Sequence, residues 1–396
     1  MKTMRTSSRP VQWYMAFGFL ATPLFFWPTY FSPYEPPKVW FLALWVVGAL
    51  GLTLLNHYGR DNSNRLLAWL IFGLFAELTI TSLVSGRFFT SVWGNPYRMD
   101  GLIALAALVV LAFIVALIWN GKLGEKIIMA IAIATGVLSL WAVGATFYSA
   151  LVPASAWWQG RVALSFGNPT ALSGYLGVSL PFSYYAYKHF FEKRRTLRGA
   201  LLIQIAAIIL TRTIGGLLCL ALFGIYLFRH RLSRAILIII FGIAIAAALG
   251  FYEYFSVRVR NPGYIVAEDR ARILMKGVIA IADRPVWGWG WAQFSRAFST
   301  IDWPTHYNVD AMVDRPHSSL LDMGVSGGIP ALVIYMTILA ISLVTLVKRQ
   351  NFLCTTLAMV LIMYVVQSQT NITSVAEDML AWFVIGVALS YKFSLG

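Results

Sequence analysis

Long apolar runs alternate with short polar connections along most of the chain. An apolar run of about 20 residues is long enough to cross a lipid bilayer as an α-helix. The seventh and eighth runs are short and nearly continuous, so one of them could be broken or re-entrant. The pattern predicts an all-α polytopic membrane protein with about twelve transmembrane helices, in one transmembrane domain over residues 1–396. The expected spans are roughly 11–31, 37–55, 66–85, 101–119, 127–150, 171–188, 199–212, 214–228, 235–252, 327–347, 352–370 and 376–391.

Composition supports this interpretation and excludes several classes of function. Hydrophobic residues make up 59% of the 396 and charged residues only 12%, about half of what a soluble domain carries. The two cysteines, Cys219 and Cys354, each lie inside an apolar run, so we expect buried thiols instead of a disulfide or metal pair. The sequence contains no pattern typical of zinc, haem or iron–sulfur ligands, and we expect no cofactor and no metal.

The net charge of +15 is distributed between loops, which is typical of membrane topology and not of a nucleic-acid-binding face. With twelve spans, the basic short loops and the N-terminus fall on one side, which the positive-inside rule assigns to the cytoplasm. The loops on the opposite, outer face are 86–100, 151–170, the turn at Arg212, 253–316 and 371–375. The basic loop residues are Arg60, Arg65, Lys122, Lys126, Lys188, Lys193, Arg194, Arg195, Arg198, Arg229, Arg231, Arg234, Lys348 and Arg349.

The loop at 253–316 is inserted between the ninth and tenth spans and is far longer than a connection requires. Its composition predicts a helix over residues 268–282, which ends before Arg284-Pro285 because the residue before a proline disfavours helical backbone. Trp287-Gly-Trp-Gly-Trp291 follows, and we interpret it as an aromatic turn at the membrane interface.

Two outer loops share a tetrapeptide, Trp93-Gly-Asn-Pro96 and Phe166-Gly-Asn-Pro169. Gly-Asn-Pro breaks a chain and lets a helix begin, so turn formation alone could explain both. A functional interpretation is that these turns hold Arg98 and Arg161 over a shared cavity.

Three further arginines on the outer face have two interpretations each. Arg212 follows an apolar run, where it could extend to the lipid headgroups or line a polar cavity, and Gly215-Gly216 would allow close approach of a ligand. Arg270 and Arg272 could form local ion pairs on a solvated helix. Alternatively, their guanidinium groups could bind a diphosphate.

His317 stands between Asp314-Arg315 and Ser318-Ser319 at the mouth of a membrane segment. A lone histidine is often structural, but a side chain that titrates near neutral pH suits a general base, which Asp314 or Asp322 could orient. Glu77 falls within the third span. Intramembrane carboxylates mark ion paths in some proteins, which keeps a transporter as an alternative.

At these residues the chain resembles the O-antigen ligase and polymerase superfamily of bacterial envelope glycosyltransferases. The likeness covers most of the chain from about residue 90. Its departures are Thr170, Thr211 and Ala331, where the family often has asparagine, serine, and glycine, threonine or tyrosine. Four segments carry it: Arg161 through Phe166-Gly-Asn-Pro169, Thr211-Arg-Thr-Ile-Gly-Gly216, Asp269-Arg270 through Arg284-Pro-Val-Trp-Gly-Trp-Gly-Trp-Ala-Gln-Phe294, and His317-Ser318 with Gly328.

The resemblance implies a GT-C-like fold in the bacterial inner membrane, with a partly helical periplasmic loop and an active site facing the periplasm. The donor would be a glycan on undecaprenyl diphosphate, and the acceptor lipid A–core oligosaccharide. Arg161, Arg212 and Arg270 would bind the diphosphate, with Arg98, Arg272, Asp314 and Arg315 as supporting candidates. His317 would be the base of an inverting, metal-independent transfer.

Two alternatives use the same superfamily chemistry: an O-antigen polymerase, and a protein O-oligosaccharyltransferase. The protein-glycosylating branch usually has an additional C-terminal periplasmic domain, and this chain ends right after its last span. The alternative of another class is a transporter of lipid-linked glycans or ions. A transporter should need Glu77 and paired cytoplasmic-facing polar residues within the spans. Here the polar groups concentrate on the outer face instead, which favours an enzyme.

Overall fold

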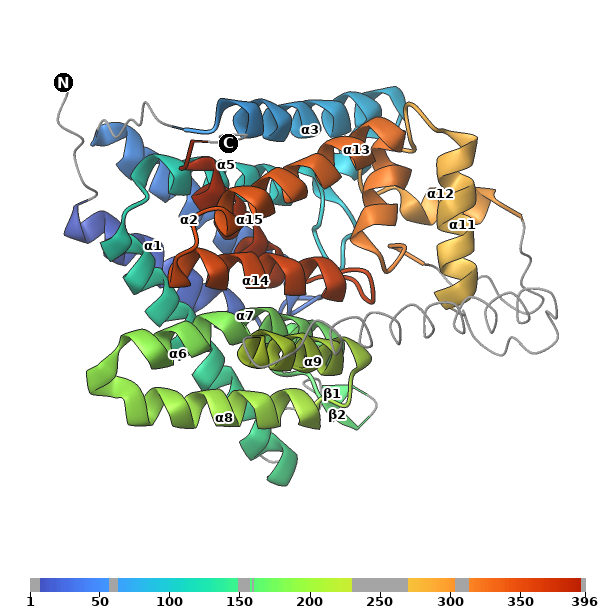
Figure 1. Ribbon diagram of the computed structural model, residues 1–396. Helices are drawn as coiled ribbons and strands as arrows, with labels where there is room; N and C mark the ends of the chain where they lie inside the picture. Colours follow the sequence, from blue (N-terminus) through green and yellow to red (C-terminus); the bar gives the residue numbers. More distant parts are fainter. Residues whose placement is uncertain are drawn as a thin grey trace, which may run out of the picture.

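The apolar runs of the sequence form α-helices that lie side by side (Figure 1). This computed structural model describes residues 8–56, 63–148, 157–158, 160–229, 270–302 and 313–392. The long helices are α1 (Arg9–Leu24), α2 (Glu35–Leu55), α3 (Arg65–Val84), α5 (Leu102–Ile118), α6 (Gly121–Phe147), α7 (Pro169–His189), α8 (Arg194–Leu210), α9 (Ile214–Phe228), α11 (Arg270–Asp283), α13 (Ser319–Val347), α14 (Phe352–Gln367) and α15 (Val375–Leu389). The shorter elements are α4 (Phe88–Trp93), α12 (Phe294–Thr300), the one-turn helices η3 (Leu164–Phe166) and η4 (Phe191–Lys193), and a hairpin of β1 (Trp157–Trp158) and β2 (Arg161–Val162).

The protein is therefore an all-α membrane protein, and a described helix corresponds to each predicted span except one. The expected span at 235–252 lies outside the described residues, so the number twelve stays a prediction. Within the described residues, four helices are long and apolar enough to cross a bilayer: α2, α3, α6 and α13. Three shorter apolar helices, α5, α9 and α14, accompany them. The seventh and eighth predicted spans are two separate helices, α8 and α9, joined by a turn at Thr211–Thr213.

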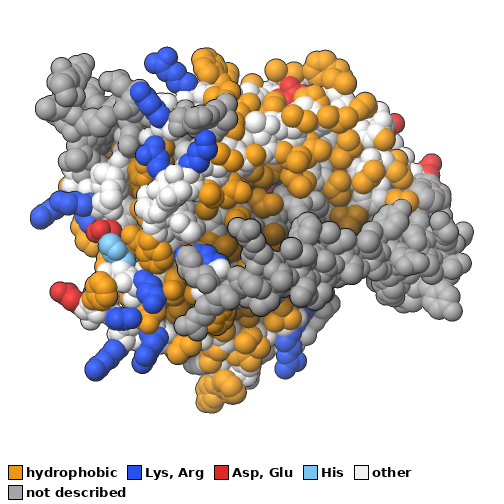
Figure 2. All heavy atoms as spheres, viewed as in Figure 1, with side chains coloured by type: hydrophobic (Ala, Val, Ile, Leu, Met, Phe, Trp, Pro, Cys, Tyr) orange, Lys and Arg blue, Asp and Glu red, His pale blue; other side chains and the backbone are white. Residues whose placement is uncertain are grey.

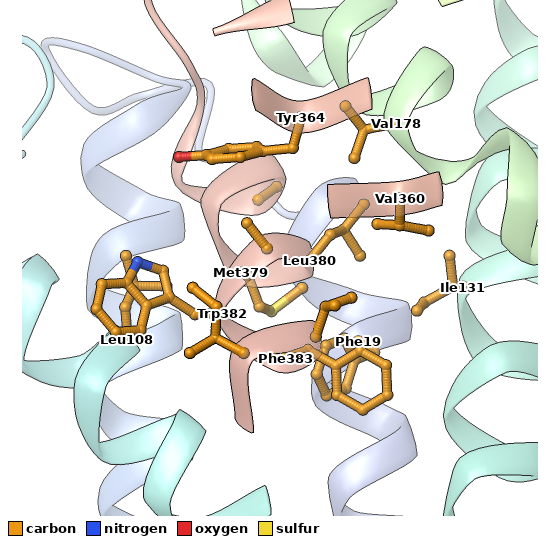
Figure 3. Packing of buried hydrophobic residues seen from close by; sticks show 14 of the residues in the cluster. Phe19, Leu108, Ile131, Val178, Val360, Tyr364, Met379, Leu380, Trp382 and Phe383 are labelled. Atoms are coloured by element: carbon orange, nitrogen blue, oxygen red, sulfur yellow. The ribbon is translucent and has the colours of Figure 1, made fainter. Parts of the chain in front are cut away.

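Helix α15 occupies the centre of the bundle, and beyond Glu377 and Asp378 in its first turn its residues are apolar. Its side chains Met379, Leu380 and Phe383 are fully buried, and Phe383 packs edge-on against Phe19 of α1 at 5.0 Å between ring centroids (Figure 3). Hydrophobic side chains also cover much of the molecular surface in this view, whereas lysine and arginine gather mainly toward its left, beside the α7–α8 connection (Figures 1 and 2). An apolar outer surface with a basic end is expected for a protein surrounded by lipid.

Helix α13 is kinked at Gly327–Gly328 and continues on both sides of the kink. It therefore begins at Ser319, eight residues before the expected tenth span at 327–347. Gly328 has a φ of 68°, and the loop after α11 closes the gap in the helix. The Ile329 amide donates to the Pro285 carbonyl at 2.7 Å, and the Trp289 amide donates to Val325 at 2.8 Å. The helix predicted over 268–282 is observed as α11, and it ends before Arg284-Pro285 as expected.

The three tryptophans of this loop do not share one environment. Trp287 is exposed, as an interfacial turn predicts, but Trp289 and Trp291 are buried. The Trp289 indole donates to the Ala280 carbonyl and stacks under Arg284, so the loop is fixed to α11. The interpretation of the motif as an interfacial aromatic turn is therefore wrong for two of its three tryptophans.

Replacing Gly328 by alanine should destabilise the protein by about 1–3 kcal/mol. A Cβ atom there would lie 2.5 Å from the Pro285 carbonyl oxygen, on a backbone with positive φ. Gly51→Ala is the matched control, because nothing lies within 4 Å of its added methyl and its backbone is helical. Thermal unfolding in detergent should show a lower melting temperature for Gly328→Ala. The melting temperature of Gly51→Ala should equal that of wild type. Equal melting temperatures would contradict the close approach described above.

Candidate active site

His317 lies immediately before α13, in a backbone conformation that is unusual for a residue with a side chain. Its φ is 55°, in the left-handed region. The following residue holds it there: the Ser318 hydroxyl caps the helix by accepting from Leu321 and donates to Gln369 Oε1 at 2.7 Å. The Ser319 amide also donates to the Ser368 carbonyl. His317 is therefore fixed against the α14–α15 turn (Ser368–Ser374), and strained residues of this kind cluster at functional sites.

The imidazole faces a cavity of about 100 Å³ between the α13 N-terminus and helices α2, α5 and α15. Its walls combine charged groups with aromatic rings. The polar and aromatic lining residues are Glu35, Arg98, Asp100, Trp291, Arg315, His317, Ser318, Ser319, Asp322, Tyr335, Tyr364, Asn371, Thr373, Asp378 and Trp382.

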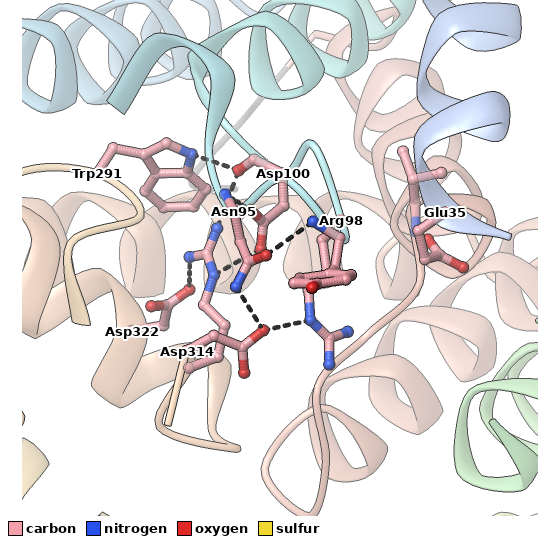
Figure 4. A network of polar contacts seen from close by, with 10 residues as sticks. Glu35, Asn95, Arg98, Asp100, Trp291, Asp314 and Asp322 are labelled. Carbon is pink, nitrogen blue, oxygen red and sulfur yellow. Dashed lines mark hydrogen bonds and ion pairs between the residues drawn. The ribbon is translucent and has the colours of Figure 1, made fainter. Parts of the chain in front are cut away.

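Arg315, two residues before His317, binds Asp100 and Asp322 in a polar network that also contains Asn95, Arg98 and Asp314 (Figure 4). It is 5% exposed, and its guanidinium donates to Asp100 through Nε (2.8 Å to Oδ2) and through Nη2 (2.9 Å to the carbonyl). It also pairs with Asp322 and lies 4.8 Å from the Trp291 ring. Burial opposes its charge, but the two carboxylates raise the pKa of Arg315 above its ordinary value. The guanidinium is thus a permanent cation, and each of its three nitrogens donates to Asp100 or Asp322.

A second ion pair joins the same network through the first Gly-Asn-Pro turn. Arg98 Nε lies 2.6 Å from Asp314 Oδ2, and Asn95 Nδ2 donates to the same oxygen at 3.4 Å. The backbone N–H of Asn95 donates to Asp100 Oδ1 at 3.1 Å. This turn consequently ties Arg98, Asp100 and the segment before His317 into one unit.

The expected partnership of Asp314 with the His317 imidazole is not seen as a hydrogen bond. Asp314 bonds with Arg98 and Asn95, and His317 Nδ1 is buried without a partner among the described residues. Asp322 bonds with Arg315 instead of His317. Both carboxylates therefore hold the segment around His317 in place, and neither bonds to the imidazole itself.

The surroundings of His317 favour a neutral imidazole. Burial lowers the pKa of His317 below its usual value, and the positive charges of Arg270 and Arg98 lower it further. Asp314 and the Asn371 side chain act in the opposite direction without cancelling the shift. A neutral imidazole at near-neutral pH is the form that a general base requires.

The predicted diphosphate arginines differ in how close they lie to this cavity. Arg270, at the start of α11, is exposed and donates to the Thr370 carbonyl at 2.8 Å, beside Asn371 of the cavity wall. Arg212 is exposed at the α8–α9 turn, with a φ of 51°. Its neighbour Gly215 approaches the same Thr370, since an added Cβ would lie 3.1 Å from the threonine hydroxyl. The α14–α15 turn thus contacts Arg270, the start of α9 that follows Arg212, and the segment that carries His317.

Two other candidates lie elsewhere. Arg161 is partly exposed in the β1–β2 hairpin, and Arg272 is 1% exposed on α11, 5.0 Å from the Phe298 ring. Like Arg212 and Arg270, neither is part of the lining of the described cavity. The second Gly-Asn-Pro turn follows Arg161, and there Asn168 caps α7 by accepting from the Thr170 amide at 2.8 Å. Turn and capping chemistry accounts for this motif, and its Gly167 packs on Tyr34 before α2.

Several groups of the cavity were not identified from the sequence. Glu35 and Asp378 lie in α2 and α15, where Asp378 accepts from the Tyr364 hydroxyl at 2.8 Å. Asp100 lies just before α5, and Asn371 lies in the α14–α15 turn. The signal available was a polar residue at the outer end of a predicted span, but many residues satisfy it.

Comparison with known proteins agrees with the motifs. The sequence model described as O-antigen ligase matches residues 199–336, a region that contains Arg212, Arg270, Arg315 and His317. No curated protein matches the chain. Over residues 199–336 the chain is thus similar to the O-antigen ligase family, which confirms the resemblance inferred from its motifs.

Proposed function

We propose that the protein is an O-antigen ligase that transfers a glycan from undecaprenyl diphosphate to a hydroxyl of lipid A–core oligosaccharide. The observation that carries the proposal is that the half-buried His317, whose surroundings favour the neutral imidazole, lies against the same α14–α15 turn as the exposed Arg270. The described helices are those of a membrane protein, which suits a donor whose polyprenyl tail lies in the bilayer. In this proposal the basic end of the bundle faces the cytoplasm of the bacterial inner membrane, and the His317 cavity faces the periplasm.

The chemistry is a single displacement. His317 takes the proton of the acceptor hydroxyl as its oxygen attacks the anomeric carbon, and the bond from that carbon to the diphosphate breaks on the opposite side. The electron pair leaves with the diphosphate, and the configuration inverts. The proton on the imidazole is then released to water.

In this proposal Arg270 and Arg212 stabilise the leaving diphosphate, because fixed positive charges favour the negative charge that develops on it. Arg161 is the third arginine of the proposed diphosphate set, although its hairpin does not line the described cavity. Arg98 and Arg315 assist indirectly, since both are paired with carboxylates. Arg272 supports α11 from beneath through its contact with Phe298.

The identity of the product tests the proposal. Purified protein is incubated with a polyprenyl-diphosphate-linked glycan, with and without lipid A–core, in the presence of a chelator. A core-linked product that forms only when core is present supports ligation. Lengthened lipid-linked glycan would instead identify a polymerase, and transport without any transfer product would overturn the enzymatic proposal.

Arg270→Gln should lower kcat/KM for the donor roughly 10- to 100-fold, the effect of losing one charge-assisted contact to the diphosphate. Arg349→Gln is the control with the same charge change, since Arg349 lies at the other end of α13 over the Tyr391 ring. Initial rates against donor concentration provide the measurement. Equal kcat/KM for both variants and wild type would exclude Arg270 from the donor site.

A further inference from the structure

A second region of interest lies far from His317, where α1 packs against α6. Two adjoining hollows of about 820 and 1010 Å³ meet there, and both are lined by Trp13, Glu125 and Lys126. Together they form one groove with an apolar part and a basic part. This region plays no role in the proposed transfer.

The basic part of the groove carries three cations, Arg9 on α1 and Lys122 and Lys126 on α6. Among the residues that the structure describes, none of the three forms an ion pair. Glu125 is the carboxylate of this part, and it pairs with His189 at 3.2 Å. The three positive charges are therefore available to an anion from outside the chain.

The apolar part continues from the cations along both helices. Trp13 and Phe17 of α1 are 63% and 54% exposed, and Ile133 of α6 is 48% exposed. The Lys126 ammonium lies 4.6 Å from the Trp13 ring, at the boundary between the two parts. A ligand that fills the groove must combine an anionic head with a long apolar tail.

We propose that this groove binds an anionic glycerophospholipid. The phosphate lies among Arg9, Lys122 and Lys126, and an acyl chain follows Trp13, Phe17 and Ile133. Charge complementarity selects this occupant over zwitterionic lipids, because the three cations have no ion-pair partner within the described part of the chain. Each basic group near a bilayer also attracts anionic headgroups. The site is independent of glycan transfer.

Native mass spectrometry of the full-length protein in detergent tests the proposal, with phosphatidylglycerol and phosphatidylcholine of identical acyl chains as probes. Wild type should retain phosphatidylglycerol preferentially. Arg9→Gln/Lys122→Gln/Lys126→Gln should reduce that preference roughly 100-fold, as expected for three such contacts. The matched control is Arg65→Gln/Arg195→Gln/Arg198→Gln, which removes the same charge from exposed residues outside the groove and should leave the preference unchanged.

A second variant tests the apolar part with all charges intact. Ile133→Trp should fill the groove and weaken retention of the lipid, and its side chain is exposed enough to be enlarged without disturbing the core. Unfolding temperatures in phosphatidylcholine should match wild type for every variant. Unchanged preference in the triple groove variant, equal loss in the control, or equal binding of glycerol phosphate without acyl chains would each overturn the proposal.

Discussion

His317→Asn should lower the rate of glycan transfer by roughly 10²- to 10⁴-fold, the usual contribution of a general base. Asparagine fits the site and hydrogen-bonds, but it cannot accept a proton from the attacking hydroxyl. The loss should appear in kcat, with little change in KM for the donor, because the arginines that bind the diphosphate remain. Single-turnover transfer from a labelled lipid-linked glycan measures the effect.

The control for this variant is a measurement of its stability, which should be unchanged. The segment that carries His317 is fixed to the α14–α15 turn through Ser318 and Gln369, and the substitution leaves that hydrogen bond intact. The melting temperature of the variant should equal that of wild type. Asparagine also adopts left-handed backbone readily, so the φ of 55° is retained without additional strain. Transfer within threefold of wild type would show that His317 does not act as the base.

The pH profile should carry the signature of the same group. A neutral imidazole is active and an imidazolium is not, so the rate falls as pH decreases through the pKa of His317. Burial and the Arg270 charge lower that pKa, which places the acidic limb below the usual value of 6.5. Arg270→Gln removes one of the lowering charges, so its acidic limb should move to higher pH. A limb that stays in place would exclude an electrostatic link between Arg270 and His317.

The sequence was most informative about elements that a single stretch of residues determines. Apolar runs predicted the helices, the proline at 285 predicted the end of α11, and the ordered motifs predicted the family. The start of α13 was mispredicted because hydropathy does not reveal that the helix continues through Gly327–Gly328. Its backbone groups at this kink form hydrogen bonds with residues 285–290 instead of within the helix.

Pairings between distant residues could not be derived in the same way. Asp314 was expected beside His317 because it lies three residues before it, yet Arg98, 216 positions earlier in the chain, takes its carboxylate. Likewise, Asp100 and Glu35 reach the cavity only because α2 and α5 pack together around α15. Which of many polar residues meet depends on the packing of helices, and one sequence leaves that undetermined.

Arg315→Met should destabilise the protein by about 3–5 kcal/mol, the cost of leaving buried carboxylates without their cation. Asp100 and Asp322 both depend on this guanidinium, whose side chain is only 6% exposed. Arg315→Lys should recover only part of the loss, since an ammonium cannot span both carboxylates as the forked guanidinium does. Thermal unfolding in detergent gives the comparison.

Arg98→Met is the matched control, because its pair with Asp314 has side chains 28% and 23% exposed. Breaking a pair that water reaches should cost about 1 kcal/mol or less. The cause can be separated from lost packing by adding Asp100→Asn and Asp322→Asn to Arg315→Met, which removes the uncompensated charges and should restore part of the stability. If the triple variant is less stable than Arg315→Met, the carboxylates do not need Arg315 as a counter-ion. The network beneath His317 would then owe its stability to packing against Trp291.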